Sequence, residues 1–231
     1  MGKDLNPAVL FSWGDFQLSV TVVTTWGVMA VLGVLAWFAT RRGASSPGAL
    51  QSAAEGIVAT LEESIAQAAP QHVRELLPFI GSLWVFLGLA NLVGLIPGLH
   101  SPTRDLSATS ALAILVFCSV HFFGIRSQGL KSYLRHYLSP SPILLPFHLI
   151  SEVTRTIALA IRLFGNMMSL EMAALLVLMV AGFLAPVPLL MLHVIEALVQ
   201  AYIFGMLALI YVAGGMQSQE LRQSTSKQKA S

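Results

Sequence analysis

The sequence predicts an all-α membrane protein with about five transmembrane helices. Of its 231 residues, 55% are hydrophobic and only 10% are charged, whereas a soluble globular domain carries about 25% charged residues. Apolar stretches of about 20 residues, the length needed to cross roughly 30 Å of hydrocarbon, recur along the chain. These observations exclude an ordinary soluble enzyme and predict a single polytopic membrane domain over residues 1–231.

The charge balance and the single cysteine limit the possible partners and ligands. The chain has 13 basic and 11 acidic residues, and this small positive excess does not predict a nucleic-acid-binding surface. Cys118 is the only cysteine, so neither an intramolecular disulfide nor a cysteine-based metal site is available. No phosphate-binding glycine loop or metalloprotease motif is present. We therefore expect no nucleic-acid partner, no cofactor and no metal.

The first three predicted spans cover residues 18–40, 78–97 and 106–124. The first is free of charge and longer than a signal-peptide core, and no small-residue cleavage pattern follows it, so we interpret it as a retained helix. Pro97 closes the second span, and a short polar loop with Arg104 and Asp105 leads into the third. We expect the second and third spans to form a helical hairpin.

The next apolar segment, residues 142–184, is too long for one perpendicular crossing. As one helix it would measure about 63 Å at 1.5 Å per residue. It must therefore be steeply tilted, bent or split. The prolines at 186 and 188 form a turn, and the last span covers residues 189–215. Polar residues interrupt the long segment at Glu152, Arg155, Arg162, Asn166 and Glu171.

The distribution of basic residues predicts the orientation, because cytoplasmic loops collect Lys and Arg. With five crossings and an extracytoplasmic N-terminus, the cytoplasmic side receives Arg41, Arg42, Arg74, Arg126, Lys131, Arg135, Arg222, Lys227 and Lys229. Only Lys3 and Arg104 then lie outside. Residues 51–69 alternate apolar and acidic positions with helical spacing and predict an amphipathic helix at the cytoplasmic interface or against a partner. Residues 217–231 are polar and predict a disordered cytoplasmic tail.

Two polar stripes run along the last two predicted helices. At helical spacing, Arg155, Arg162, Asn166 and Ser169 fall within a stripe about 60° wide, and Glu171 points roughly the opposite way. In the last span, His193, Glu196, Gln200 and Tyr211 form a similar stripe. Two antiparallel helices joined by a short turn could pair parts of these stripes and leave Arg162 facing a further partner.

Arg162 is the strongest functional candidate. A charged side chain at the bilayer centre costs about 2.5–3.5 kcal/mol on insertion scales, and Arg162 has no acidic residue at i±3 or i±4 to neutralise it. Arg155 has both a structural and a functional interpretation, because Glu152 lies at i−3 and the interface is within snorkelling reach. Polar residues such as Ser169 and Asn91 can simply hydrogen-bond neighbouring helices. The carboxylates and the imidazole of Glu171, His193 and Glu196 could form a proton relay.

These residues carry a family resemblance. The relevant segments are Arg162-Leu163-Phe164-Gly165-Asn166-Met167-Met168 followed by Glu171, Gln200-Ala201-Tyr202-Ile203-Phe204, Asn91-Leu92 followed by Pro97, and Pro47-Gly48 with Gln51 and Glu55. They resemble the signature of subunit a of bacterial F-type ATP synthases, from about Pro47 to the last span. Two positions depart from it: Gly94 stands where some members have an acidic residue, and Glu196 is an additional carboxylate beside His193.

The resemblance implies a role as the ion-translocating stator subunit of the membrane F0 sector. In that family a long tilted helix carries an essential arginine and packs with the final helix against a rotating ring of c subunits, and Arg162 occupies the motif position. The implied ion-translocation residues are Arg162, Asn166, Glu171, His193, Glu196 and Gln200, and no residue is catalytic. The implied partners are the c-ring, the b subunits of the peripheral stalk, the lipid bilayer and, indirectly, the F1 sector. The implied location is a bacterial inner membrane.

Other interpretations of the sequence stay open. A secondary transporter would bind its substrate between repeated halves, and no internal repeat is visible. A scaffold protein with structural polar contacts would tolerate loss of Arg162, and an intramembrane hydrolase would need a paired nucleophile and base. Within the resembled family, protons suit the His and Glu relay, and sodium remains the alternative because its ligands lie largely on the c subunit.

Overall fold

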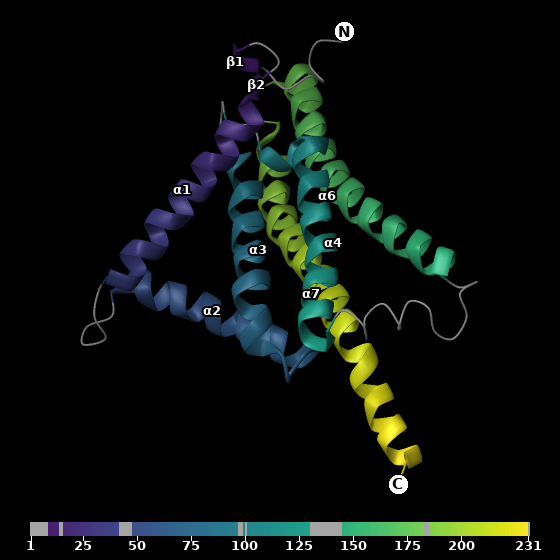
Figure 1. Cartoon of the computed structure of the whole chain (residues 1–231). Coiled ribbons are helices and arrows are strands. Elements are labelled where there is room, and N and C mark those ends of the chain that lie inside the picture. Colours follow the sequence, from purple (N-terminus) through teal and green to yellow (C-terminus); the bar gives the residue numbers. More distant parts are fainter. Residues whose placement is uncertain are drawn as a thin grey trace.

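The computed structural model describes residues 9–13, 16–41, 48–96, 99, 101–129, 145–182 and 185–230. Within this part of the chain, five helices are long and apolar enough to cross a membrane, which confirms the predicted all-α membrane fold. These helices are α1 (Val20–Arg41), α3 (Val73–Val93), α4 (Leu106–Gln128), α6 (Leu145–Ala181) and α7 (Val187–Ala230). Figure 1 shows α3, α4 and α7 side by side, with α1 and α6 leaning away from them on opposite sides.

A short β-hairpin precedes α1. Strand β1 (Val9–Trp13) pairs antiparallel with β2 (Phe16–Ser19), a feature for which the sequence offered no signal. Helix α1 then leaves the bundle, and Val28 is its one buried residue within the described range. Trp26 and Trp37 are 64% and 49% exposed. Such an apolar, exposed helix fits a lipid environment.

Helix α2 (Ala49–Ala68) corresponds to the predicted amphipathic segment. It lies across the lower ends of α1 and α3 in Figure 1. Only its C-terminal half packs into the core: Ile65 and the capping Ala69 are fully buried, whereas Ile57 is 53% exposed. The predicted apolar face therefore exists, and the chain itself covers only part of it.

The bounds of α3 differ from the predicted span 78–97. The helix begins at Val73, with Glu75 in its first turn and Pro78 inside it, and ends at Val93. A carboxylate in the first turn favours a helix N-terminus, so the helix takes in polar residues that a hydropathy criterion excludes. At the other end the chain turns at Gly94, and Ser101 folds back against it so closely that a Cβ at 94 would lie 3.0 Å from the Ser101 Cβ.

The last helix also corrects an expectation. Its backbone stays helical to Ala230, through the polar segment 217–231 that was expected to be disordered. Ten of its 15 residues are Gln, Lys, Glu, Leu, Arg or Ala, which are good helix formers, so the polarity that argues against a membrane core does not argue against a helix. Several other sequence positions lie outside the described residues: Lys3, Arg42, Pro97, Gly98, Lys131, Arg135 and residues 142–144.

The core lies where α7 packs against α3 and α4. Phe204, Leu87 and Leu209 are fully buried there. The closest approach is at Gly205, where a Cβ would lie 1.9 Å from the Trp84 Nε1. The Trp84 indole donates a hydrogen bond to the Tyr202 carbonyl at 3.1 Å, and the absence of a side chain at Gly205 allows the indole to lie directly against the backbone of α7.

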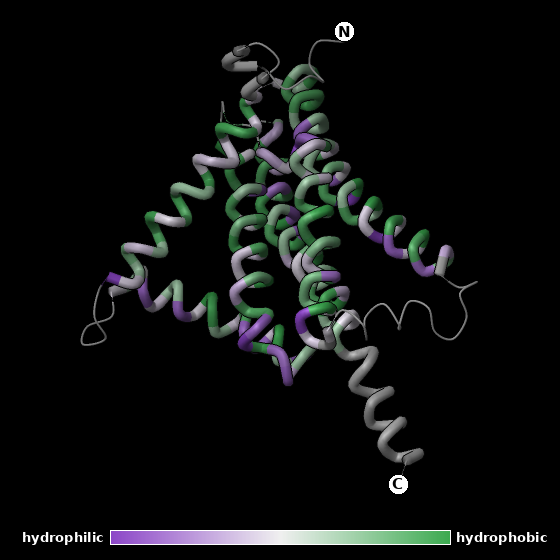
Figure 2. The backbone as a smooth tube through the Cα atoms, in the orientation of Figure 1, coloured by the Kyte–Doolittle hydropathy of each residue, from purple (hydrophilic) through white to green (hydrophobic). Residues whose placement is uncertain are grey.

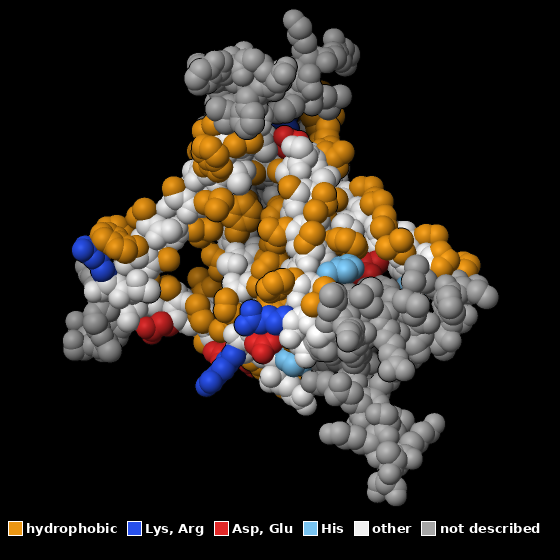
Figure 3. Space-filling view, in the orientation of Figure 1, with side chains coloured by type: hydrophobic (Ala, Val, Ile, Leu, Met, Phe, Trp, Pro, Cys, Tyr) orange, Lys and Arg blue, Asp and Glu red, His pale blue; other side chains and the backbone are white. Residues whose placement is uncertain are grey.

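Helix α6 is continuous over 37 residues, or about 55 Å. Over its described residues the long segment is therefore one continuous helix rather than a split one, and it packs against α4 and α7. Figure 2 shows hydrophilic positions recurring along α6 within an otherwise apolar helix. In Figure 3, hydrophobic side chains cover the flanks of the molecule, and charged ones gather mainly towards its lower end.

Candidate functional site

Arg162 lies on the exposed face of α6. Leu159, Leu163 and Met167 are buried against the bundle, with 3%, 0% and 1% of their surface exposed, whereas Arg162 and its neighbour Ile161 are exposed. The helix is apolar enough to cross a membrane. The Arg162 guanidinium therefore projects from the outer side of an apolar helix, free to face a further partner as the sequence predicted.

Asn166, one turn further along α6, joins this helix to α7. Its Nδ2 donates a hydrogen bond to the Gln200 Oε1 at 2.7 Å. This contact confirms that the two polar stripes meet in part. Gln200 is 2% exposed, so the pair is shielded within the α6–α7 contact.

Two buried nitrogens on α7 lack a protein partner. Within the described residues, no hydrogen-bond partner is present for the Gln200 Nε2 or for the His193 Nε2. His193 is 6% exposed. A buried polar group without a partner costs about 1–3 kcal/mol, and buried water is the usual way in which such groups are satisfied. This face of α7 is therefore suited to a hydrated path.

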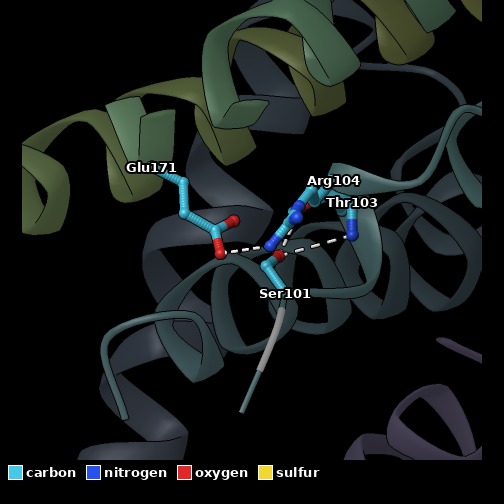
Figure 4. A network of polar contacts seen from close by, with 4 residues as sticks. All are labelled: Ser101, Thr103, Arg104 and Glu171. Carbon is cyan, nitrogen blue, oxygen red and sulfur yellow. Dashed lines mark hydrogen bonds and ion pairs between the residues drawn. The ribbon is translucent and has the colours of Figure 1, made fainter. Parts of the chain in front are cut away.

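Glu171 lies on the side of α6 that faces the loop between α3 and α4. There it forms a salt bridge and hydrogen bond with Arg104 of the short helix η1 (Pro102–Arg104). Figure 4 shows the two side chains reaching towards each other from α6 and from η1. Both are partly buried, with side-chain exposures of 26% for Arg104 and 22% for Glu171. The sequence predicted an outer-loop position for Arg104 and gave no sign of its pairing with Glu171.

Hydrogen bonds from α3 and α7 hold η1 in place. Ser101 donates to the Ala90 carbonyl at 2.9 Å, and its oxygen caps η1 by accepting from the Thr103 backbone N–H. The Thr103 hydroxyl donates to the Asn91 Oδ1 at 2.7 Å, and the Asn91 Nδ2 donates to the Ala197 carbonyl at 3.1 Å. Asn91 and Thr103 are fully buried. The sequence favoured a structural role for Asn91, and this network gives it one.

Asp105 follows η1 and has a separate set of partners. Its carboxylate accepts from the Ser107 backbone N–H at 2.9 Å and so caps α4. It also accepts a hydrogen bond from the Thr21 hydroxyl at 2.9 Å, which fastens the start of α1 to this end of the bundle.

A second polar cluster lies where the early part of α6 meets α4 and α7. The Arg155 guanidinium stacks over the Tyr211 ring, 4.5 Å from its centroid. Both residues line a small cavity together with Glu152 and Thr156, and it has room for about one water molecule. Arg155 therefore has an aromatic partner in Tyr211. Glu152, the partner suggested by the i−3 spacing, lines the same cavity.

The structure thus distributes the candidate residues over distinct places. Asn166 and Gln200 are in contact, Glu171 pairs with Arg104, and Arg162 faces outward. His193 and Glu196 lie one turn apart on α7, the first buried and the second partly buried. Among the residues described, no three His, Cys, Asp or Glu side chains are grouped to hold a metal ion.

Comparisons with known proteins bear on this arrangement. Residues 22–213 match the family model described as ATP synthase A chain. The chain is 61% identical to the ATP synthase subunit a 2 of Pelobacter propionicus over 220 residues, which covers 95% of this chain and 96% of the relative. It is 61% identical to the ATP synthase subunit a 1 of Hahella chejuensis, covering 100% of this chain and 98% of the relative. It is 54% identical to the ATP synthase subunit a of Legionella pneumophila (strain Philadelphia 1), covering 92% and 93%.

Proposed function

The chain belongs to the ATP synthase A chain family, and from this premise we propose that it is the ion-translocating stator subunit of the F0 sector, carrying two proton half-channels against a rotating c-ring. The observation that carries the proposal is the place of Arg162, exposed on the outer face of a membrane-crossing helix. As a multi-pass membrane component of the ATP synthase, it couples proton flow to ATP synthesis.

The exposure of Arg162 argues for a partner with a negative charge. Arginine stays protonated in proteins, and a guanidinium facing hydrocarbon is costly. Ala158, one turn before Arg162 on nearly the same face, is exposed, and the adjacent Ile161 is 56% exposed, so uncovered apolar side chains border the charge. A ring of apolar helices with mid-membrane carboxylates complements this face in both hydrophobicity and charge.

Arg162 then acts on each carboxylate of the ring as it passes. An opposite charge within about 4–6 Å favours the ionised form, so the carboxylate gives up its proton next to Arg162. The same fixed charge blocks direct proton leakage between the half-channels. A ring carboxylate must be neutralised before it enters the lipid, and this requirement ties rotation to ion transfer. Membrane potential contributes about 2.3 kcal/mol per charge per 100 mV.

The remaining residues line the path on the extracytoplasmic side. Glu171, His193 and Glu196 are nearer to the turn between α6 and α7 than to the other end of either helix. The Asn166–Gln200 hydrogen bond lies between them and Arg162 along α6. The buried nitrogens of His193 and Gln200, which lack protein partners in the described structure, support a hydrated route along this face.

The orientation follows from the positive-inside rule. The end of α1, the start of α3 and the end of α4 all lie in the lower part of Figure 1, and they carry Arg41, Arg74 and Arg126. We assign that end and the C-terminus to the cytoplasm, and the N-terminus to the extracytoplasmic side of a bacterial inner membrane. The polar C-terminal part of α7 is then a cytoplasmic extension of a single domain, and the b subunits of the peripheral stalk are further partners.

The subunit itself is non-catalytic in this proposal, because ATP chemistry belongs to the F1 sector, which it contacts indirectly. Protons are the proposed coupling ion, since carboxylates and an imidazole suit a proton relay. Sodium is the alternative, and the c subunit decides between them. A self-contained secondary transporter is the remaining alternative, and it requires no c-ring.

The test is ATP-driven acidification of inverted membrane vesicles that carry the whole ATP synthase, with Arg162→Ala compared with wild type. Arg126→Ala serves as the matched control, because it removes an arginine from the end of α4, away from α6. We expect loss of pumping in Arg162→Ala with normal assembly, and unchanged pumping in the control. Normal pumping by Arg162→Ala refutes the stator mechanism. If the vesicles take up sodium without acidification, and a protonophore does not affect this uptake, the coupling ion is sodium and not the proton.

A further inference from the structure

We propose that Arg104 is a positioning residue for ion uptake: its guanidinium holds the Glu171 carboxylate against η1, so that Glu171 accepts a proton only by separating from the guanidinium. The inference rests on the proposed function, because it takes Glu171 to lie on the ion path. It assigns to the loop between α3 and α4 a role in that path.

The geometry of the pair supports this role. Arg104 and Glu171 are in salt-bridge contact, at 26% and 22% side-chain exposure, so solvent screens them less than a surface pair. The guanidinium does not release its proton, so only the carboxylate of the two can change its charge. Proton uptake forms a neutral O–H on Glu171 and leaves Arg104 without that counter-ion; proton release restores the pair. Each cycle at Glu171 therefore works against the attraction of Arg104.

Arg104 is held rigidly enough to play this part. The residue before it, Thr103, is fully buried and bonded to Asn91, which in turn bonds to the Ala197 carbonyl on α7. Figure 4 shows Ser101 and Thr103 directly beside the pair. A guanidinium on an anchored turn cannot follow the carboxylate as a flexible loop would, so separation of the two charges has a definite cost.

The other ionisable groups on the elements that pack around Glu171 either bond to other partners or lie elsewhere on their helices. Asp105, at the start of α4, is occupied by the Ser107 backbone and the Thr21 hydroxyl. On α7, His193 and Glu196 are the ionisable residues of the first turns. On α6, Arg162 lies on the opposite face. Arg104 is a cation in direct contact with Glu171.

Wild-type and variant ATP synthases are assembled whole in membrane vesicles, and F1 is then removed. The experiment measures how passive proton flux through the remaining F0 depends on pH. Arg104→Gln removes the charge but keeps a hydrogen-bonding side chain, Arg104→Lys keeps the charge, and Arg126→Gln is the control. Because Arg104→Gln removes the positive charge beside Glu171, the alkaline limb of its flux profile is expected to move to higher pH. Arg104→Lys and Arg126→Gln are expected to retain the wild-type profile.

The outcomes separate this proposal from the proposed function. An unshifted profile in Arg104→Gln, with or without a lower maximal flux, overturns the role of Arg104, as does an equal shift in the Lys variant. If Arg104→Gln fails to assemble, Glu171→Asp draws the carboxylate back from the fixed guanidinium, and an unshifted profile in that variant overturns the proposal in the same way. Arg162→Ala is measured in parallel: if it conducts and pumps normally, the stator function fails, whereas a failure confined to Arg104 leaves that function intact.

Discussion

Replacing Gly205 by alanine tests the close packing of α3 against α7. The added Cβ would lie 1.9 Å from the Trp84 Nε1 and 2.1 Å from its Cδ1, whereas ordinary contacts are 3.4–4 Å. The indole must therefore move by roughly 1.5 Å, the difference between 3.4 and 1.9 Å. Trp84 is only 5% exposed and donates to the Tyr202 carbonyl, so the move disturbs neighbours and breaks that bond.

The magnitude follows from these two effects. Overpacking a core costs about 1–3 kcal/mol, and loss of the hydrogen bond costs about 0.5–1.5 kcal/mol. The higher helix propensity of alanine returns about 1 kcal/mol. We expect a net destabilisation of about 1–3 kcal/mol, which is measured as a lower midpoint for heat-induced loss of this chain from the detergent-solubilised complex.

Two companion variants make the test specific. Gly214 lies on the same helix, and a Cβ there meets nothing within 4 Å, so Gly214→Ala is expected to keep or raise the wild-type midpoint, because alanine has the higher helix propensity. Adding Trp84→Leu to Gly205→Ala opens space for the methyl group and is expected to recover part of the loss. If Gly205→Ala is as stable as Gly214→Ala, the close approach of the two helices is wrong and the reasoning fails.

Two further predictions concern the polar contacts. Asn91→Leu removes the bonds to Thr103 and Ala197 and leaves buried groups unpaired. We expect it to lower the thermal midpoint of the complex by an amount equivalent to about 1–3 kcal/mol. An unchanged midpoint would contradict the assignment. Tyr211→Phe keeps the aromatic ring under Arg155 and is expected to pump protons at nearly the wild-type rate, whereas Tyr211→Leu loses an interaction of about 0.5–2 kcal/mol and is expected to pump more slowly. Quinacrine fluorescence in inverted vesicles measures both rates. Slower pumping by Tyr211→Phe than by Tyr211→Leu would contradict the prediction.

Hydropathy alone sufficed to predict five helices that are long and apolar enough to cross a membrane, whereas it left open whether the long segment is tilted, bent or split. Charge-free length identifies a span because the bilayer imposes that length, and a helix of 37 residues cannot stand upright in it. The same criterion placed the start of α3 at Pro78 and treated the polar end of α7 as disordered, because it measures transfer into lipid and not helix formation. Helix ends depend instead on first-turn charges and backbone propensity.

The candidate site was predictable only as far as helical periodicity reaches. Periodicity gives the direction of a side chain around its own helix axis, and so it identified the outward Arg162 and the facing Asn166 and Gln200. It does not tell which element lies in that direction. The Arg104–Glu171 contact joins residues 67 apart in sequence, through a turn of η1 that no periodic pattern encodes, and it could be found only from the packed structure.

The placement of Glu171 also decides between a stator and a scaffold. A scaffold interpretation needs an internal counter-charge for Arg162, and Glu171 is the next acidic residue along α6. The two are nine positions apart (171 − 162), which on a helix is about 13.5 Å of rise and about 180° of rotation. Glu171 is moreover engaged with Arg104. It therefore cannot neutralise Arg162 from within the helix, and a negative charge supplied by another chain remains the economical way to stabilise an arginine on this apolar, exposed face.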